Sequence, residues 1–173
     1  MDPKQLSQEL RKGDSPDLNR RRQIIGLSML GAAIGEAITL YQTGVIDELP
    51  SLPGSFFDAN KVDASDYAYS RFNSPDGPTM TINYGITAWL ASMGGENRVK
   101  DQPLVPLAMG AKLLFDAFLT AELAREEWKD NKAFCEYCQL ATLASFASLA
   151  IALPEVTEAA RNLAGRSSTR SNS

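Results

Sequence analysis

The two cysteines of this 173-residue sequence stand three positions apart, in Cys135-Glu136-Tyr137-Cys138. An apolar run follows them, so we predict that they lie in the first turn of a helix. Residues at i and i+3 share one helical face, close enough for a disulfide. The unpaired N–H groups and the dipole of a helix N-terminus lower the pKa of a thiol there. Cys135 and Cys138 are therefore the predicted catalytic residues of a dithiol that exchanges disulfides.

Two other interpretations of the pair remain open: it is inert or vestigial, or it is half of a metal site shared with another chain. The sequence contains no histidine, which removes haem ligation through histidine, Ser-His-Asp catalysis and the usual zinc ligand sets. We expect no metal and no haem. The formal net charge of −4, with no basic face interleaved with aromatics, argues against nucleic acid as a partner.

Four apolar segments are predicted to position the pair as membrane-spanning helices, at residues 24–46, 78–95, 103–123 and 134–153. About 20 residues cross the hydrocarbon core of a bilayer. Small residues within the segments allow helices to approach closely in lipid. A soluble four-helix bundle is the alternative, but its helices would each carry a polar face, which the first, second and fourth segments lack.

We thus predict an all-α integral membrane four-helix bundle over residues 20–155, with an irregular outer loop between helices 1 and 2. Polar tails occupy residues 1–19 and 156–173, and Pro154 is expected to end the last helix. Basic residues test the orientation, because cytoplasmic segments of membrane proteins are rich in lysine and arginine. Eleven of the 17 lie before the first apolar segment, in the C-terminal tail and in the loop at 96–102. Both termini are therefore predicted to be cytoplasmic, with the cysteines on the outer or lumenal side of a bacterial inner or thylakoid-type membrane.

A resemblance rests on two stretches, RRRQIIGLSMLGAAIGEAITLYQTGVI near the start and AFCEYCQLATLASFASLAIALPE near the end, with a long outer loop between the first two helices. This arrangement, over residues 20–155, resembles the vitamin K epoxide reductase family. The resemblance implies an oxidoreductase that passes electrons from a thioredoxin-like thiol protein, or a fused domain, to a quinone inside the bundle. It also implies that Cys138 faces the quinone, that Cys135 exchanges with incoming thiols, and that Asn83 contacts a quinone carbonyl.

The outer loop departs from the family pattern, because a second cysteine pair that normally relays electrons is missing from residues 47–77. Two hypotheses follow. The chain is a thiol–quinone oxidoreductase whose dithiol is reduced directly, or it is a non-catalytic structural subunit of a larger membrane complex that retains the bundle. Aromatic residues of this loop are expected either to cap the mouth of the bundle or to form a belt at the membrane surface: Phe56, Phe57, Tyr67, Tyr69 and Phe72.

Charged residues inside the predicted spans call for a partner, since an isolated charge in lipid is costly. Lys112 and Asp116 are one helical turn apart and are predicted to form an ion pair that faces the bundle interior. Proton delivery to a quinone is the alternative role. Glu36 has no partner on its own helix, and a bond to Lys112 is its expected outlet.

Overall fold

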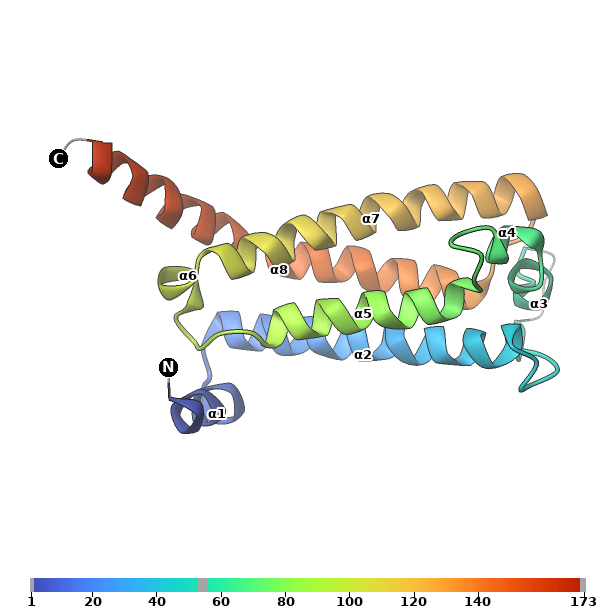
Figure 1. Cartoon of the computed structure of the whole chain (residues 1–173), viewed down its shortest axis with the longest axis horizontal. Coiled ribbons are helices and arrows are strands. Elements are labelled where there is room, and N and C mark those ends of the chain that lie inside the picture. Colours follow the sequence, from blue (N-terminus) through green and yellow to red (C-terminus); the bar gives the residue numbers. More distant parts are fainter. Residues whose placement is uncertain (1, 53–55, 172–173) are drawn as a thin grey trace.

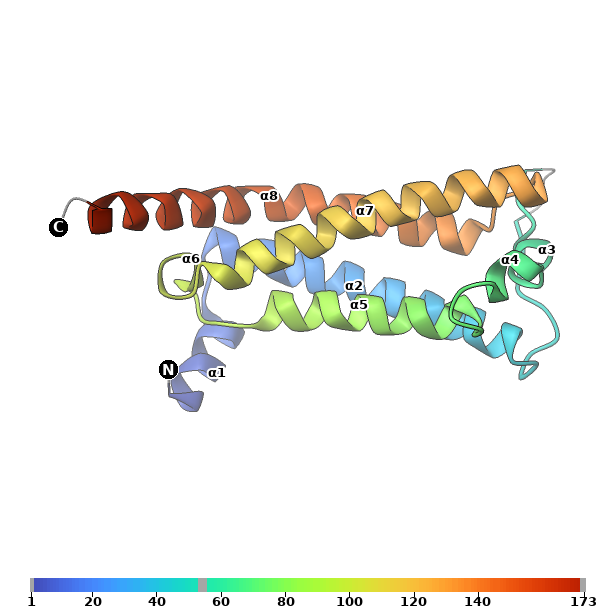
Figure 2. The ribbon, with the colours of Figure 1, turned by 45° about the horizontal axis from the view of Figure 1, so that its top comes forward.

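The computed structural model describes residues 2–52 and 56–171, and four long helices run side by side along its longest axis (Figures 1 and 2). They are α2 (Pro16–Gln42), α5 (Asp76–Ser92), α7 (Leu104–Asn131) and α8 (Glu136–Ser171). No strand occurs among the residues described. The predicted all-α helical bundle is confirmed.

Short helices close the two ends of the bundle (Figure 1). At one end, α3 (Ala59–Asp63) and α4 (Asp66–Tyr69) lie beside the start of α8, and we call this the cysteine end. At the other, the terminal end, lie α1 (Pro3–Lys12), α6 (Arg98–Asp101) and the last turns of α8. The loop predicted to be irregular therefore contains two short helices. The N-cap residue of α3 is Asp58, whose side chain accepts a hydrogen bond from the Lys61 N–H.

Three helices are long and apolar enough to cross a membrane: α2, α7, and α8 as far as Arg166. Their outer surfaces carry large apolar side chains, among them Phe115, Phe118 and Leu143, each more than 60% exposed. Such a surface suits lipid contact. The chain is an integral membrane protein. The remaining predicted span, residues 78–95, corresponds to α5, which has 17 residues. Its length of about 25 Å is slightly less than the thickness of the hydrocarbon core.

The small residues predicted to permit close packing do so where α2 crosses α5. A Cβ atom on Gly35 would lie 2.9 Å from the Thr81 backbone nitrogen and 3.0 Å from the Gly77 carbonyl oxygen. One on Gly31 would lie 2.5 Å from the ring of Tyr84. Glycine at these positions allows α2 to lie directly against α5, so α5 is held on α2 along its length.

The helix boundaries differ from those predicted because capping residues, rather than apolar runs, set them. The first long helix begins at Pro16, where the Ser15 hydroxyl accepts a hydrogen bond from the Leu18 N–H at 3.3 Å. It ends at Gln42 instead of residue 46, just before Gly44 turns the chain with a φ of +74°. The third, α7, runs two turns further than predicted, to Asn131.

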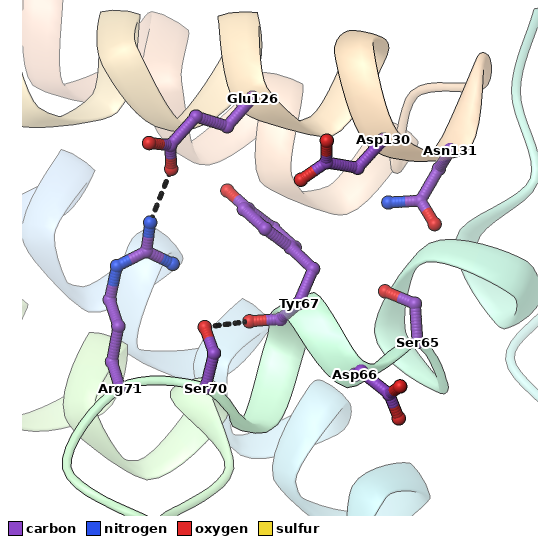
Figure 3. A pocket seen from close by; sticks show the side chains of 8 residues that line it. All are labelled: Ser65, Asp66, Tyr67, Ser70, Arg71, Glu126, Asp130 and Asn131. Carbon is purple, nitrogen blue, oxygen red and sulfur yellow. Dashed lines mark hydrogen bonds and ion pairs between the residues drawn. The ribbon is translucent and has the colours of Figure 1, made fainter.

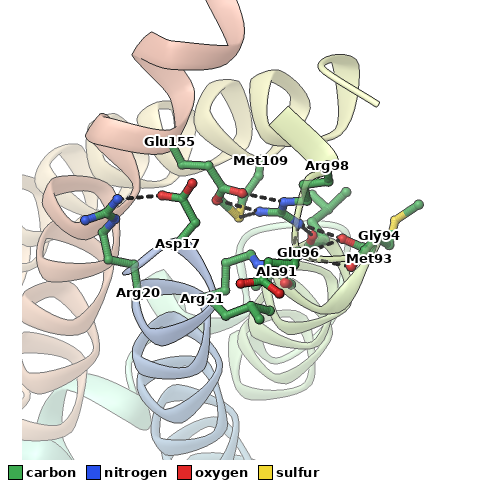
Figure 4. A network of polar contacts seen from close by, with 12 residues as sticks. Asp17, Arg20, Arg21, Ala91, Met93, Gly94, Glu96, Arg98, Met109 and Glu155 are labelled. Carbon is green, nitrogen blue, oxygen red and sulfur yellow. Dashed lines mark hydrogen bonds and ion pairs between the residues drawn. The ribbon is translucent and has the colours of Figure 1, made fainter. Parts of the chain in front are cut away.

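The prediction that Pro154 ends the last helix was wrong, since α8 continues through it to Ser171. A proline removes one backbone hydrogen bond, and tertiary contacts offset that loss here. The neighbouring Glu155 forms a buried bidentate ion pair with Arg98 of α6 (Figure 4). The Arg98 Nε and Nη2 atoms lie 2.6 and 2.8 Å from the two Glu155 carboxylate oxygens. Arg21 of α2 donates to the Met93, Gly94 and Gly95 carbonyl oxygens in the same network. These contacts join α2, α6 and α8 at the terminal end.

Lys112 and Asp116 face the bundle interior, as predicted. Their ion pair measures 2.5 Å, and Asp116 is 1% exposed. The ammonium also donates to the Asn83 carbonyl oxygen at 2.8 Å and to the Thr87 hydroxyl. The predicted bond between Glu36 and Lys112 was wrong, because Glu36 lies on the exposed face of α2.

Candidate functional site

The cysteine pair lies where α8 begins. Cys135 directly precedes the helix and its side chain is fully buried, whereas Cys138, in the first turn, is half-buried. The backbone N–H of Cys138 donates to the Cys135 sulfur at 3.2 Å, so Cys135 takes the N-cap position of α8. Both are present as thiols. The predicted proximity of the two sulfurs on one helical face is therefore confirmed.

A buried carboxylate from the outer loop lies against both thiols. Asp63, the last residue of α3, is 1% exposed. Its Oδ2 accepts a hydrogen bond from the Cys135 thiol at 3.2 Å, and its Oδ1 accepts a longer one from the Cys138 thiol at 3.9 Å. Cys138 of α8, Cys135 just before it and Asp63 of α3 thus form a single site, which we call the thiol–carboxylate cluster.

Several contacts hold α3 over the start of α8. The backbone pairs there as an isolated bridge, in which the Phe134 N–H donates to the Phe56 carbonyl at 2.8 Å and the Asp58 N–H to the Phe134 carbonyl at 3.0 Å. The Lys61 ammonium donates to the Asn131 carbonyl at 2.8 Å. From α2, the Gln42 side-chain amide reaches the Asp63 carbonyl at 3.3 Å. The position of α3, and with it of the Asp63 carboxylate, is therefore set by α2, α7 and the segment between α7 and α8.

A second buried carboxylate orients the first turn of α8. Glu127 of α7 is 3% exposed, and its Oε1 accepts the backbone N–H of Cys135. Its Oε2 accepts the Gln139 side-chain amide at 2.9 Å. Glu127 satisfies an N–H group that a helix N-terminus leaves unpaired. It thereby fixes the backbone on which both thiols stand.

The electrostatics of the cluster are governed by burial. Burial raises the pKa of Asp63 to about 7, and the hydrogen bonds from Cys135 and Cys138 limit that rise. For Cys135, the hydrogen bond with Cys138 lowers the pKa, but burial and the Asp63 carboxylate raise it by more. The net direction for Cys135 is upward. The expectation of a lowered thiol pKa was thus wrong for this residue, because burial of the thiol, together with the nearby Asp63 carboxylate, outweighs the hydrogen bonds with Cys138 that lower its pKa.

The cluster offers three ligand atoms, one each from Asp63, Cys135 and Cys138, within 4.8 Å of one another. A structural zinc site uses four protein ligands. Among the described residues, no further cysteine, aspartate or glutamate joins this group.

Apolar side chains adjoin the thiols on the bundle side. Ile34 and Ile38 of α2 and Tyr84 of α5 belong to the same packed cluster as Cys135, and Cys138 lies against it. The Tyr84 hydroxyl donates to the Ala141 carbonyl oxygen of α8 at 2.5 Å and lies 2.9 Å from the Ser145 hydroxyl. Tyr84 therefore connects α5 to the helix that carries the cysteines.

The predicted Asn83 is half-buried on α5, beside Tyr84. Its carbonyl oxygen accepts the bond from Lys112 of α7, so its backbone belongs to the polar group around that lysine. Sequence reasoning missed Asp63, Glu127 and Tyr84. Asp63 is one of several acidic residues in its loop, and nothing in the spacing of these acids distinguished it.

The outer loop also packs on α7. Phe56 stacks on Trp128 with ring centroids 6.3 Å apart, and the Tyr67 hydroxyl donates to the Leu123 carbonyl at 3.0 Å. Phe72 is 87% exposed. The contacts of Phe56 and Tyr67 favour the first of the two predicted roles of the loop aromatics, a cap, and place it over α7. The exposed Phe72 side chain takes no part in this cap.

Beside Tyr67 is an open polar cavity of about 530 Å³ between α4 and α7 (Figure 3). Arg71 and Glu126 face each other across it in an ion pair of 2.5 Å. Neither cysteine lines this cavity. It is therefore separate from the thiol–carboxylate cluster.

Comparison with known proteins gives one match. The model of the vitamin K epoxide reductase family matches residues 22–153, which is about three quarters of the chain and includes all three members of the thiol–carboxylate cluster. Neither a curated protein nor a solved structure matches the sequence.

Proposed function

The chain belongs to the vitamin K epoxide reductase family, and from this premise we propose that its Cys135–Cys138 dithiol passes two electrons to a membrane quinone. The observation that carries the proposal is the meeting of both thiols beside an apolar cluster at one end of a membrane bundle. Family membership supports thiol oxidoreductase chemistry in general. The electron acceptor and the roles of the two cysteines are part of the proposal.

The dithiol is arranged to form a disulfide. Two thiols become a disulfide by losing two electrons and two protons, and the S–S bond is about 2.05 Å long. Because the ligand atoms of the cluster lie within 4.8 Å of one another, closing this bond requires a local movement of the two side chains. Asp63 contacts both thiols and accepts their hydrogen bonds. Glu127 keeps the backbone of Cys135 in place.

The chemistry of the residues around Cys138 fits a quinone. A quinone supplies an apolar ring that takes up two electrons and two protons. Cys138 and Met80 both pack against the apolar cluster to which Tyr84 belongs, and Met80 and Tyr84 are apolar over most of their surface. We propose that these two hold the ring, with Cys138 facing it. Asn83 remains the proposed partner of a quinone carbonyl, through its side-chain amide.

Reduction of the disulfide requires an incoming thiol, and we propose a thioredoxin-like protein or a small dithiol as its source. The loop lacks relay cysteines, and Asp63 occupies the space against the pair. Cys135 is fully buried beneath α3. Exchange at Cys135 therefore requires α3 to move, which breaks the contacts of Lys61 and Gln42 with neighbouring backbone.

A structural subunit of a larger complex is the second candidate. It is favoured by α8, whose last turns extend away from the other three long helices (Figure 1) and leave Leu163 exposed. Purification in a mild detergent distinguishes the two. The enzyme is expected to emerge by itself with bound quinone, and the subunit is expected to emerge within a complex.

The enzymatic proposal is tested by supplying purified protein with a small dithiol and a short-chain quinone. We expect quinone reduction by the wild type and none by Cys138→Ala, because the thiol that faces the quinone is lost. Cys135→Ala is expected to trap a single covalent adduct without turnover, because no second thiol resolves it.

The double variant Cys135→Ala/Cys138→Ala is the control for direct reaction of dithiol with quinone. Wild-type turnover no faster than that of this variant would refute the oxidoreductase proposal. The structural-subunit candidate would then replace it.

A further inference from the structure

We propose that Asp63 is the proton acceptor of the dithiol: it takes one of the two thiol protons when the disulfide forms and returns it when the pair is reduced. This inference rests on the proposed function and adds to it the route of the proton. It is carried by the contacts of Asp63 with both sulfurs, at 3.2 and 3.9 Å, inside a buried cluster.

The first argument is conservation of charge. An ionised Asp63 beside two neutral thiols carries one negative charge. Transfer of the Cys135 proton to Oδ2 gives a neutral carboxyl and a thiolate, so the total charge of the cluster stays the same. Loss of that proton to water would leave two anions in one buried site, which burial strongly disfavours. Asp63 therefore permits a thiolate to form where the Cys135 thiol is otherwise hard to ionise.

The second argument concerns what changes on oxidation. In the dithiol form, both hydrogen bonds to Asp63 come from thiols, and they hold its pKa near 7 against burial. In the disulfide form neither sulfur carries a proton, so both hydrogen bonds are lost. Burial then acts without this opposition, and the pKa of Asp63 rises above 7. The carboxyl consequently binds a proton more tightly after oxidation.

The other titratable groups around Asp63 do not supply a positive charge. From the start of α8 and the residue before it they are Cys135, Glu136, Tyr137 and Cys138; from α7, α5 and α2 they are Glu127, Asp76 and Tyr41. None of them is a cation, and within the described parts of the chain no lysine or arginine is paired with Asp63. The carboxylate therefore has no ion-pair partner that would keep it ionised in the disulfide form.

The proton balance gives a measurable signature. Between pH 7 and the higher pKa of Asp63 in the disulfide form, reduction of the disulfide takes two electrons but only one proton from solution, because the second comes from Asp63. Below pH 7, Asp63 is protonated in both forms, and two protons come from solution. At a fixed ambient potential, the ratio of disulfide to dithiol then changes tenfold per pH unit above pH 7 and hundredfold per pH unit below it. These changes correspond to shifts in the midpoint potential of about 30 mV and about 59 mV per pH unit. The break between the two slopes is expected near pH 7.

The experiment equilibrates the full chain in detergent micelles with oxidised and reduced dithiothreitol on both sides of pH 7, without quinone. Because dithiothreitol also takes up two protons on reduction, its ratio is adjusted at each pH so that the ambient potential stays the same. The thiols are trapped by alkylation and counted by mass spectrometry. We expect the break in the wild type and in Asp66→Asn, which changes an exposed carboxylate of the same loop. We expect Asp63→Asn to follow the hundredfold slope throughout.

A single hundredfold slope in the wild type would overturn the proposal, and so would a break that persists in Asp63→Asn. A break that disappears only in Glu127→Gln would assign the proton to that residue and also overturn it. If Asp63→Asn does not fold, the wild-type slope and its redox-difference infrared spectrum decide. The latter is expected to gain the band of a protonated carboxyl on oxidation. Since no quinone is present, failure here is distinct from failure of the quinone-reductase proposal.

Discussion

Replacing Lys112 by methionine removes the ammonium that neutralises Asp116 inside the bundle. Asp116 is 1% exposed, and its Oδ2 bonds to Lys112 at 2.5 Å. Its other oxygen, Oδ1, has no hydrogen-bond partner among the described residues. Lys112→Met therefore leaves a buried carboxylate without any donor. We expect a loss of about 3–5 kcal/mol in the free energy of unfolding, the range for breaking a buried ion pair.

Asp116→Asn is expected to cost less, since the ammonium of Lys112 keeps two other acceptors. These are the Asn83 carbonyl oxygen and the Thr87 hydroxyl. A loss of about 1–3 kcal/mol follows from the weaker remaining hydrogen bonding. The double variant Lys112→Met/Asp116→Leu is expected to lie within about 1 kcal/mol of the wild type or above it, because no charge remains to be buried.

Unfolding is measured by titrating a denaturing detergent into micelles while the fluorescence of Trp89 and Trp128 is followed. Lys129→Met is the matched control, since Lys129 lies exposed on the same helix, and its loss should stay below about 0.5 kcal/mol. A loss for the double variant equal to the sum of the two single losses would show that the two charges are uncoupled. The reasoning from burial would then be refuted.

Two further predictions concern packing and orientation. Gly35→Ala is expected to destabilise the protein by about 1–3 kcal/mol because its Cβ would meet the backbone of α5, whereas Gly85→Ala, with nothing within 4 Å, should be neutral or stabilising in the same unfolding assay. A similar stability of the two variants would contradict this account of close packing. For orientation, a cysteine placed at exposed Ser70, at the cysteine end, should react with an impermeant maleimide on intact cells when both native cysteines are absent. Lys12→Cys should react only after permeabilisation, and the reverse pattern would overturn the predicted topology.

Much of the fold followed from local patterns. The apolar segments, their small residues and the i, i+4 spacing of Lys112 and Asp116 are short-range features, and each corresponds to a helix or a buried pair in the structure. Helix ends were harder to predict. Pro154 resembled a terminator because the loss of one backbone bond was visible in the sequence, whereas the Arg98–Glu155 pair that supports the helix was not.

The candidate site divides in the same way. The Cys135–Cys138 spacing by itself determined that two thiols share one helical face, since three positions make nearly one turn of any α-helix. Only the tertiary structure decided what surrounds them. Asp63 is 72 residues from Cys135 along the chain, and it reaches the thiols because α3 is held by contacts with α2, α7 and the segment just before α8. Burial then sets the charge of that carboxyl, and burial is a property of the packed chain that no single stretch of sequence carries.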